Sequence, residues 1–275
     1  MDFSPKNDLR KFLDEDIGRE DITSKLLIRK KIKAKIITRE KCIVAGTNFT
    51  KQIFSLKGCK TKIIKNDGSF VKPNQIIAEI TGLSNSVLMC ERTALNLLAR
   101  MSGIATDTDE LIRKIKKSKS KSELLATRKT APGLRFFDKV AVEIGGGKKH
   151  RMRLDTMVMI KDNHLAIHDS ISKLIKKAKK SHKKIEVEVE SEKDAILAAK
   201  LGVNVILLDN FTPKKIQQIM KRLDRLGLRK KVKLEASGRI NLKNIQSYAK
   251  TGVDMISVGS ITSSPKSIDM SLEIC

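Results

Sequence analysis

The sequence predicts an α/β protein in which a smaller N-terminal α+β domain precedes a C-terminal domain of alternating strands and helices. From about residue 122 onward, short apolar segments alternate with segments of helical spacing. This repetition implies parallel strands joined by right-handed crossovers, which form either a barrel or a doubly wound sheet. The first ~110 residues differ, because alternating apolar and polar segments surround turn signals there. Polar residues also follow nearly every predicted C-terminal strand at the same end.

The N-terminal domain is expected to cover residues 1–110. Its strands are predicted at Lys33–Arg39 and Gln75–Ile80, with turns at residues 66–68 and 72–74. A long helical pattern over Asn85–Ser102 closes the domain. The Lys/Ser-rich stretch Lys114–Lys121 is the best boundary candidate, and the second domain is expected to cover residues 111–264. We expect residues 265–275 to pack back on the first domain.

The second domain contains six predicted strands with helices between most of them. The helices are expected at Ser191–Leu201, at Pro213–Leu226 after the cap residue Thr212, and at Asn241–Thr251 before Gly252. The strands are predicted at Glu123–Lys129, Met157–Lys161, Ile185–Glu190, Val205–Asp209, Lys233–Ser237 and Met255–Gly259.

The formal net charge of +26 allows two interpretations, a nucleic-acid-binding protein or an enzyme for polyanionic small molecules. Aromatic residues make up only 3% of the chain, which leaves little material for base stacking. The lysine runs fall on predicted helix faces and loops, where solvated surface charge is the simpler explanation. We therefore do not expect specific nucleic-acid binding.

The remaining composition favours a cytoplasmic protein. The four cysteines are scattered without a C-x-x-C pair, so we expect reduced thiols and neither a zinc site nor a disulfide framework. No window approaches ~18 uninterrupted apolar residues, so no membrane span is expected. The N-terminal segment lacks the apolar run of a secretory signal.

Polar residues at the strand ends predict an active site, because a βα barrel builds its site from the C-terminal ends of its strands. The segment Ile185–Glu190 reads I-E-V-E-V-E, which in a helix-covered barrel points Glu186, Glu188 and Glu190 inward if the valines pack against helices. Buried carboxylates need cationic partners or a metal ion. The strand-end residues are Arg128, Lys129, Lys161, Glu188, Glu190, Asp209, Ser237, Gly238, Gly259 and Ser260.

Two further groups predict an anionic ligand. Thr127-Arg128-Lys129 and His150-Arg151 flank the glycines at 145–147 and together suit a ligand with adjacent carboxylates. Small residues in Glu235–Gly238 and Ser257–Ser260 would let backbone N–H groups approach a phosphate. Such a phosphate site is common at the last strands of a barrel.

Several long motifs resemble the quinolinate phosphoribosyltransferases, and the resemblance runs nearly end to end. The motifs are Glu15–Gly18 with Asp21–Thr23, Glu91–Asn96, Ser102–Thr106, Thr127–Leu134, Gly145–Gly147 with His150-Arg151, Ile160–His164, Glu186–Glu190, Leu207–Asn210, Leu234–Gly238 and Thr251–Asp254. The resemblance implies an N-terminal α+β open-sandwich domain followed by an incomplete α/β barrel of the type II phosphoribosyltransferase kind. It also implies transfer of phosphoribosyl from phosphoribosyl pyrophosphate to quinolinate with decarboxylation, which gives nicotinate mononucleotide in de novo NAD biosynthesis.

The resemblance also assigns residues. Quinolinate would bind Arg92, Arg128, Lys129, His150 and Arg151, with Arg92 supplied by the other subunit of a homodimer or larger assembly that shares its sites. Thr127 is a further predicted substrate-binding residue. Phosphoribosyl pyrophosphate would bind Lys161, Glu188, Asp209 and Glu235, with its 5-phosphate at Ser237, Gly238, Gly259 and Ser260. The catalytic residues would be Lys129, Lys161, Glu188 and Asp209, and Mg²⁺ would bind Glu188 and Asp209, mainly through phosphoribosyl pyrophosphate.

The sequence departs from the family pattern at Arg239, which either adds a phosphate contact or projects outward. Two alternatives stay open. One is a related phosphoribosyltransferase-like protein associated with molybdate transport, which the intact Lys161 and Asn163 disfavour. The other is a basic nucleic-acid-binding protein.

Overall fold

The computed structural model describes residues 5–168, 170–180 and 184–275. The chain forms two compact units. The first comprises the chain up to Asp109, together with Ala131–Gly146 and Ser264–Cys275, and the second comprises Glu110–Thr130 and Gly147–Ser263. The segment Ala131–Gly146 thus belongs to the first unit, although it lies within the range assigned to the second domain from the sequence.

The first unit contains a four-stranded antiparallel sheet. Its strand order is β12 (Met270–Ile274), β1 (Lys31–Thr38), β5 (Ile76–Leu83) and β3 (Lys60–Ile63), so the C-terminal strand extends this N-terminal sheet. In β1 the apolar residues are buried in alternation with lysines, as a strand with one covered face requires. Smaller elements complete the early part of the unit: α1 (Pro5–Ile17), η1 (Ser24–Leu26), β2 (Cys42–Ile43), α2 (Thr47–Leu56) and β4 (Phe70–Val71).

The long helix α3 (Ser84–Lys117) contradicts the expected end at Ser102. Leu111 and Ile115 are buried at helical spacing, and no proline interrupts the segment, so the helix continues into the Lys/Ser-rich stretch. Gly103 permits a close backbone approach, since a Cβ there would lie 1.7 Å from the Lys266 carbonyl oxygen.

Helix α4 (Arg135–Ile144) is amphipathic and belongs to the first unit. Its buried Phe137 packs edge-to-face against Phe49 at a centroid distance of 5.0 Å. Asp138 is fully buried and receives both Arg100 Nε at 2.7 Å and Arg100 Nη2 at 2.9 Å. This bidentate pair supplies the partner that a buried carboxylate requires.

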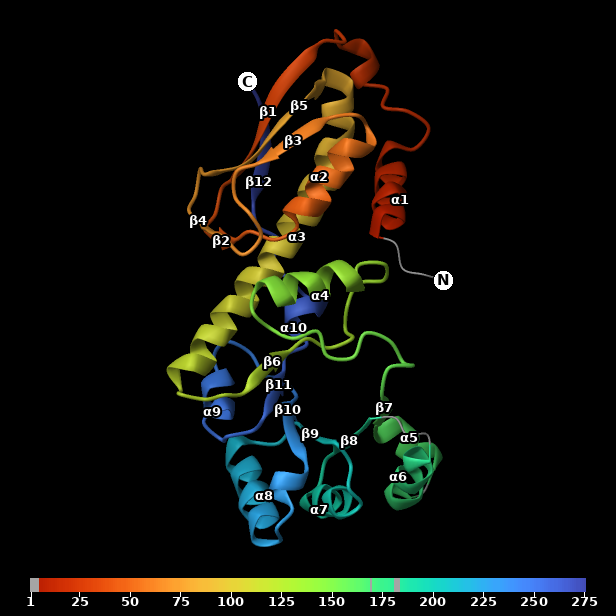
Figure 1. Ribbon diagram of the computed structural model, residues 1–275, viewed down its shortest axis with the longest axis vertical. Helices are drawn as coiled ribbons and strands as arrows, with labels where there is room; N and C mark the ends of the chain where they lie inside the picture. The colour runs from red at the N-terminus through yellow and green to blue at the C-terminus, as the bar shows by residue number, and fades with distance from the viewer. Residues whose placement is uncertain (1–4, 169, 181–183) are drawn as a thin grey trace. The chain divides into compact units, whose positions relative to one another are not determined.

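The second unit is built on a six-stranded parallel sheet, and all six strands lie within the predicted ranges. The strand order is β6 (Glu123–Leu125), β11 (Met255–Ser257), β10 (Lys233–Ser237), β9 (Val205–Asp209), β8 (Ile185–Val189) and β7 (Val158–Ile160). Figure 1 shows helices following these strands along the chain: α5 (Asp162–Ile167), α6 (Ile171–Lys179), α7 (Glu192–Lys200), α8 (Pro213–Arg225), α9 (Ile245–Ala249) and α10 (Ser260–Ser263), with η2 (Arg229–Lys231) before β10.

The parallel sheet is curved. Leu125 of β6, Met255 of β11 and Val205 of β9 form one buried cluster. In a flat sheet β6 and β9 would lie about 14 Å apart, because neighbouring strands are ~4.8 Å apart. The sheet therefore bends around an interior, and β6 and β7 remain its two edges. This confirms the expected incomplete α/β barrel.

The helix boundaries of this unit follow local capping. The side chains of Ser191 and Thr212 accept hydrogen bonds from the third residues of α7 and α8, as N-caps do. The helix expected from Asn241 begins only at Ile245, because the Asn244 side chain accepts from the backbone of Asn241 at 2.8 Å and forms a turn first.

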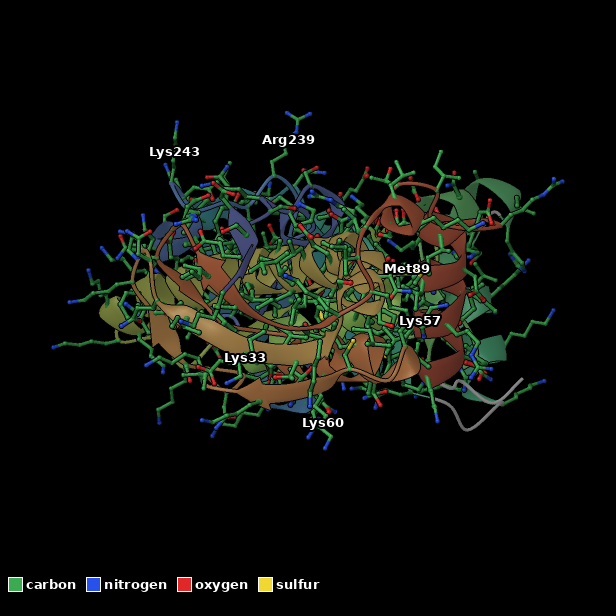
Figure 2. All side chains as sticks on the ribbon, turned by 90° about the horizontal axis from the view of Figure 1, so that it is seen from above. Lys33, Lys57, Lys60, Met89, Arg239 and Lys243 are labelled. Carbon is green, nitrogen blue, oxygen red and sulfur yellow. The ribbon has the colours of Figure 1, made fainter. Side chains whose placement is uncertain are left out.

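Basic side chains lie on the surface of both units. Lys33 and Lys60 of the antiparallel sheet and Lys243 of the barrel are exposed. The side chains of Lys60 and Lys243 project away from the ribbon (Figure 2). Among the described residues, no helix is both long enough and apolar enough to span a membrane.

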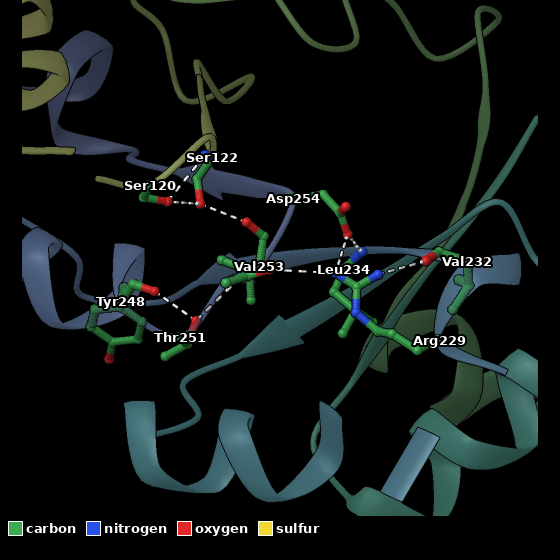
Figure 3. Close-up of polar contacts among 10 residues, drawn as sticks. Ser120, Ser122, Arg229, Val232, Leu234, Tyr248, Thr251, Val253 and Asp254 are labelled. Atoms are coloured by element: carbon green, nitrogen blue, oxygen red, sulfur yellow. Dashed lines mark hydrogen bonds and ion pairs between the residues drawn. The ribbon is translucent and has the colours of Figure 1, made fainter. Parts of the chain in front are cut away.

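Polar contacts close the N-terminal end of the barrel strands (Figure 3). Asp254 accepts from the Leu234 backbone at 2.7 Å and pairs with Arg229 at 3.0 Å. Ser122 donates to the Val253 carbonyl at 2.5 Å. These contacts tie β6, β10 and β11 together at the end opposite the predicted site.

Candidate active site

The predicted site residues of the second unit follow the carboxyl ends of neighbouring parallel strands. The strands β8, β9 and β10 pair in parallel register, with Glu188 opposite Leu207 and Asp209 opposite Ser237. Glu188, Asp209 and Ser237 therefore all lie near the carboxyl end of the sheet. The segment after β6 carries Thr127 and the basic residues that follow it. The carboxyl end of the strands is where α/β barrels build their active sites.

An ion pair joins the carboxyl ends of β7 and β8. Lys161 Nζ lies 2.5 Å from Glu188 Oε2, and both side chains are partly buried. Lys161 directly follows β7 and precedes α5, and its backbone N–H donates to His164 Nδ1 at 2.9 Å. The backbone of Lys161 is therefore fixed at the end of β7, while its ammonium group can reach a ligand there.

The ends of β9 and β10 are tied to each other. The Asn210 backbone N–H donates to the Ser237 carbonyl at 3.0 Å, and the Asn210 side chain donates to Asp209. Gly238 has φ +96°, and a Cβ there would lie 2.6 Å from Asn210 N. Only glycine permits this approach, which leaves the backbone of the turn uncovered.

A second small-residue turn follows β11. A Cβ on Gly259 would lie 3.4 Å from Lys129 Cδ and 3.7 Å from Thr127 Oγ1, so the residues after β6 and β11 are neighbours. Ser260 begins the short helix α10 and is exposed. Arg239, which follows Gly238, is exposed and projects away from the ribbon (Figure 2), so the structure favours the outward alternative for this residue.

Two guanidinium groups lie near each other beside these turns. Burial and the nearby charge of Arg128 lower the pKa of Arg151, whereas Glu186 opposes the change. Arg128 Nε is buried without a hydrogen-bond partner among the described residues. Like charges held together with an unused donor are suited to an anion that can receive several N–H groups.

His150 lies against two buried carboxylates. Its Nε2 is 3.1 Å from Glu186 Oε2 and 3.4 Å from Glu235 Oε2. Burial acts to lower the pKa of His150, but the two carboxylates dominate and raise it to about 9. Burial, with the charge of Glu235 added, raises the pKa of Glu186. The two carboxylates therefore favour the protonated form of His150 at neutral pH.

The predicted inward carboxylates divide into three environments. Glu186 is fully buried, Glu188 is partly buried, and Glu190 is exposed beyond the end of β8. Glu235, expected near phosphoribosyl pyrophosphate, is 1% exposed and accepts a hydrogen bond from Ser257. The structure thus places Glu235 with Glu186 and His150 in the barrel interior.

Arg92 lies in the first unit. It is exposed on α3 and lines a hollow of about 760 Å³ within that unit, together with Asp16, Asn96 and Arg100. Its assignment to a partner's site stays a prediction.

Two residues that organise the site were not among the individual site residues predicted from the sequence. Asn210 connects β9 to β10, and Ser257 holds Glu235. Asn210 follows Asp209 directly, and Ser257 lies one strand period before Gly259, so the strand-end pattern could have included both.

The fold and the strand-end residues define a βα-barrel protein with a site for polyanionic ligands. A family model described as the quinolinate phosphoribosyl transferase N-terminal domain matches residues 21–102, and one described as its C-terminal domain matches residues 104–273. The chain belongs to the quinolinate phosphoribosyl transferase family.

Individual relatives match along nearly the whole chain. Proteins named probable nicotinate-nucleotide pyrophosphorylase (carboxylating) are 44% identical in Methanocaldococcus jannaschii and 42% identical in Methanothermobacter thermautotrophicus. The matches cover 97% of this chain in both cases, and 95% and 97% of the relatives. The solved structure of the nicotinate-nucleotide pyrophosphorylase from Francisella tularensis is 37% identical, with a TM-score of 0.91 over 99% of this chain and 98% of that one.

Proposed function

We propose that the protein transfers the phosphoribosyl group of phosphoribosyl pyrophosphate to quinolinate with decarboxylation. The products are nicotinate mononucleotide, CO₂ and pyrophosphate, in de novo NAD biosynthesis. The proposal rests on two groups of residues in the barrel, a group of cations and a set of turns at the carboxyl ends of the strands. Arg128 and Arg151 lie near each other, and His150 lies beside Glu186 in the same barrel. Lys161, Gly238 and Gly259 follow the carboxyl ends of β7, β10 and β11, and Gly259 lies beside Lys129.

The cationic site suits a dicarboxylate. Quinolinate has carboxylates on adjacent ring carbons, and the three cations Arg128, His150 and Arg151 exceed what one carboxylate would balance. A ligand with a single carboxylate would leave a desolvated cation without its partner, which costs ~2–5 kcal/mol. We therefore propose that nicotinate is a poor substrate.

The strand-end turns suit the phosphate groups. The backbone at Gly238 is uncovered, and Gly259 lies against Thr127 and Lys129. Lys161, held beside Glu188, can exchange this carboxylate for a pyrophosphate oxygen without leaving the strand end. We assign the 5-phosphate to the turns with Ser237, Gly238, Gly259 and Ser260, and the pyrophosphate to Lys161.

The residues fit Mg²⁺ that arrives with the substrate. Mg²⁺ prefers oxygen ligands and commonly takes one or two protein carboxylates together with substrate phosphates. Glu188 and Asp209 supply carboxylate oxygens at neighbouring strand ends, and both are partly buried. When bound, Mg²⁺ would neutralise charge on the departing pyrophosphate.

The reaction then follows from the arrangement. The pyridine nitrogen donates its electron pair to C1 of the ribose as the C1–pyrophosphate bond breaks. Positive charge that develops at C1 is stabilised by the carboxylates of Glu188 and Asp209, while Lys161 balances the leaving group. The electron pair of the broken C2–carboxylate bond stays on C2 when CO₂ leaves, where the adjacent positive ring nitrogen stabilises it, and C2 then takes a proton. Lys129, beside Gly259, is placed to orient the reacting groups.

Two further assignments are part of the proposal. A homodimer would bring Arg92 of one subunit to the barrel of the other, because Arg92 is exposed on α3 and lies in the unit that lacks the barrel. A cytoplasmic location agrees with the free cysteines, of which Cys42, Cys59 and Cys90 are buried.

One assay tests the proposed function. Purified protein is incubated with phosphoribosyl pyrophosphate, Mg²⁺ and quinolinate, and nicotinate mononucleotide and CO₂ are measured, with nicotinate as the parallel substrate. We expect turnover of quinolinate and a kcat/KM for nicotinate at least about 30-fold lower. Absence of turnover would overturn the proposal, as would equal use of both acids. Saturable duplex binding without turnover would instead support a nucleic-acid-binding protein.

A further inference from the structure

Three buried side chains lie together in the barrel interior: His150, Glu186 and Glu235. Glu186 is 0% exposed and Glu235 1%, while the side chain of His150 retains 14%. Both carboxylates approach the same ring atom, Nε2, at 3.1 and 3.4 Å. The exposed part of His150 is therefore the only part of this cluster that a ligand can reach readily.

The orientation of the imidazole is held from several sides. The Ser257 hydroxyl donates to Glu235 Oε1, which leaves Oε2 turned toward His150. Glu186 and Glu235 come from β8 and β10, two strands separated by β9. The backbone of His150 has φ +52°, a conformation that a non-glycine residue keeps only where its surroundings impose it.

The contact places a proton on Nε2 of the ring. Nε2 faces two carboxylate oxygens, so an unprotonated Nε2 would set its lone pair against two anions. Neither oxygen of Glu186 has a hydrogen-bond partner among the described residues, so charge has to compensate its burial. A neutral ring with Nε2–H would leave Nδ1 as an acceptor, whereas an imidazolium presents Nδ1–H as a donor.

We propose that Glu186 and Glu235 are positioning residues, which hold His150 as an imidazolium with Nε2 inward and Nδ1–H available to a carboxylate of the substrate. The inference deepens the proposed function and rests on it. It moves Glu235 from the phosphate side of the site to the dicarboxylate side. It also gives a role to Glu186, whose fully buried carboxylate lies against His150.

The charges around the cluster agree with this role. The groups that face His150 are Glu186 from β8 and Glu235 from β10, and Arg151 acts on Glu186 as a second cation. Arg128 adds further positive charge beside Arg151. Two buried carboxylates thus balance the inner side of a site that would otherwise hold several cations without counter-charge.

The same three ligand atoms lie within 4.8 Å of one another and could hold a metal ion in place of the proton. A metal would require a deprotonated Nε2, whereas the two carboxylates raise the pKa of His150 to about 9, against the opposing effect of burial. At neutral pH a metal therefore has to displace this proton, and metal content becomes an outcome of the test.

The first experiment measures the pKa of His150 by NMR and does not depend on enzyme activity. The chain has four histidines, so NMR titration of the imidazole carbon-bound protons gives few signals, and the signal lost in His150→Gln identifies His150. We expect His150 to titrate near pH 9 in the wild-type protein. Titration near 6.5 would overturn the inference even if the enzyme turned over quinolinate, which separates this failure from failure of the proposed function.

The second experiment removes one charge at a time with isosteric variants. Glu235→Gln and Glu186→Gln are compared with Glu123→Gln, which makes the same chemical change at the exposed start of β6. At pH 8 we expect kcat/KM for quinolinate to fall at least about 10-fold in the two buried variants, with KM for phosphoribosyl pyrophosphate within about 2-fold of wild type. The control should match wild type in both.

The pH profile distinguishes positioning from simple loss of packing. In the buried variants the alkaline limb of kcat/KM for quinolinate should move toward pH 6.5, so activity should partly recover at pH 6, where the imidazole is protonated again. An unchanged profile would overturn the inference. So would one equivalent of tightly bound metal in the wild type that both variants lose.

Discussion

Replacing Gly238 by alanine tests the strand-end turn assigned to the 5-phosphate. Gly238 has φ +96°, and the added Cβ would lie 2.3 Å from Asn210 Oδ1 and 2.6 Å from Asn210 N. The left-handed backbone costs a non-glycine residue ~1–2 kcal/mol. The overlap adds a second cost, because Asn210 has to move and its backbone hydrogen bond to Ser237 weakens.

The magnitude follows from these two contributions. A backbone hydrogen bond of this kind contributes ~1 kcal/mol, so Gly238→Ala should lower the free energy of unfolding by ~2–3 kcal/mol. Gly252→Ala is the matched control. Gly252 has a similar φ of +85°, but its nearest contact would be the flexible end of Met220 at 3.5 Å. The control should therefore lose only ~1–2 kcal/mol.

Urea unfolding and steady-state kinetics measure the two variants. In Gly238→Ala, movement of the turn should raise KM for phosphoribosyl pyrophosphate at least about 10-fold, which corresponds to ~1.4 kcal/mol. KM for quinolinate should change less, and Gly252→Ala should leave both constants near wild type. If the two variants behaved alike in stability and in KM, the reasoning from the Gly238–Asn210 approach would be refuted.

Three further predictions follow. Arg92→Ala and Lys161→Ala should each be inactive, and dimers that contain one subunit of each variant should recover up to about a quarter of wild-type activity by random pairing. No recovery, despite subunit exchange measured by mass spectrometry, would exclude a shared site. Gly103→Ala should lower the free energy of unfolding in urea by at least ~3 kcal/mol, because overlap with the Lys266 carbonyl outweighs a gain of ~1 kcal/mol in helix propensity; an increase would contradict the close approach. The raised pKa of His150 should contribute ~3 kcal/mol of stability that is complete below pH 6.5 and lost as pH rises through about 9; an equal pH dependence in His150→Gln would rule this out.

The strands of the barrel could be predicted from local pattern because a parallel sheet covered by helices requires short apolar segments between amphipathic ones. Each of the six strands lies within its predicted range. The end of α3 could not be predicted in the same way. The residues after Ser102 are rich in charge, and the burial of Leu111 and Ile115 that continues the helix depends on tertiary packing.

Division into units also depended on contacts between distant segments. Strand β12 pairs with β1, as the expectation for residues 265–275 requires, but α4 joins the first unit through contacts that no local pattern signals. Asp138 with Arg100, and Phe137 with Phe49, are such contacts. Amphipathic spacing predicts that a helix has a buried face, and it does not predict which element covers that face.

The sequence by itself determined the strand-end residues Lys161, Glu188 and Asp209, because a barrel builds its active site at the carboxyl ends of its strands. It also determined the inward direction of Glu186, because side chains alternate along a strand. Only the tertiary structure decided that Glu186 and Glu235 meet at His150. These residues come from two strands and a loop, and a carboxylate in a barrel interior has several possible partners. Sheet curvature and the left-handed backbone of His150 select one of them, and both arise from packing of the whole unit.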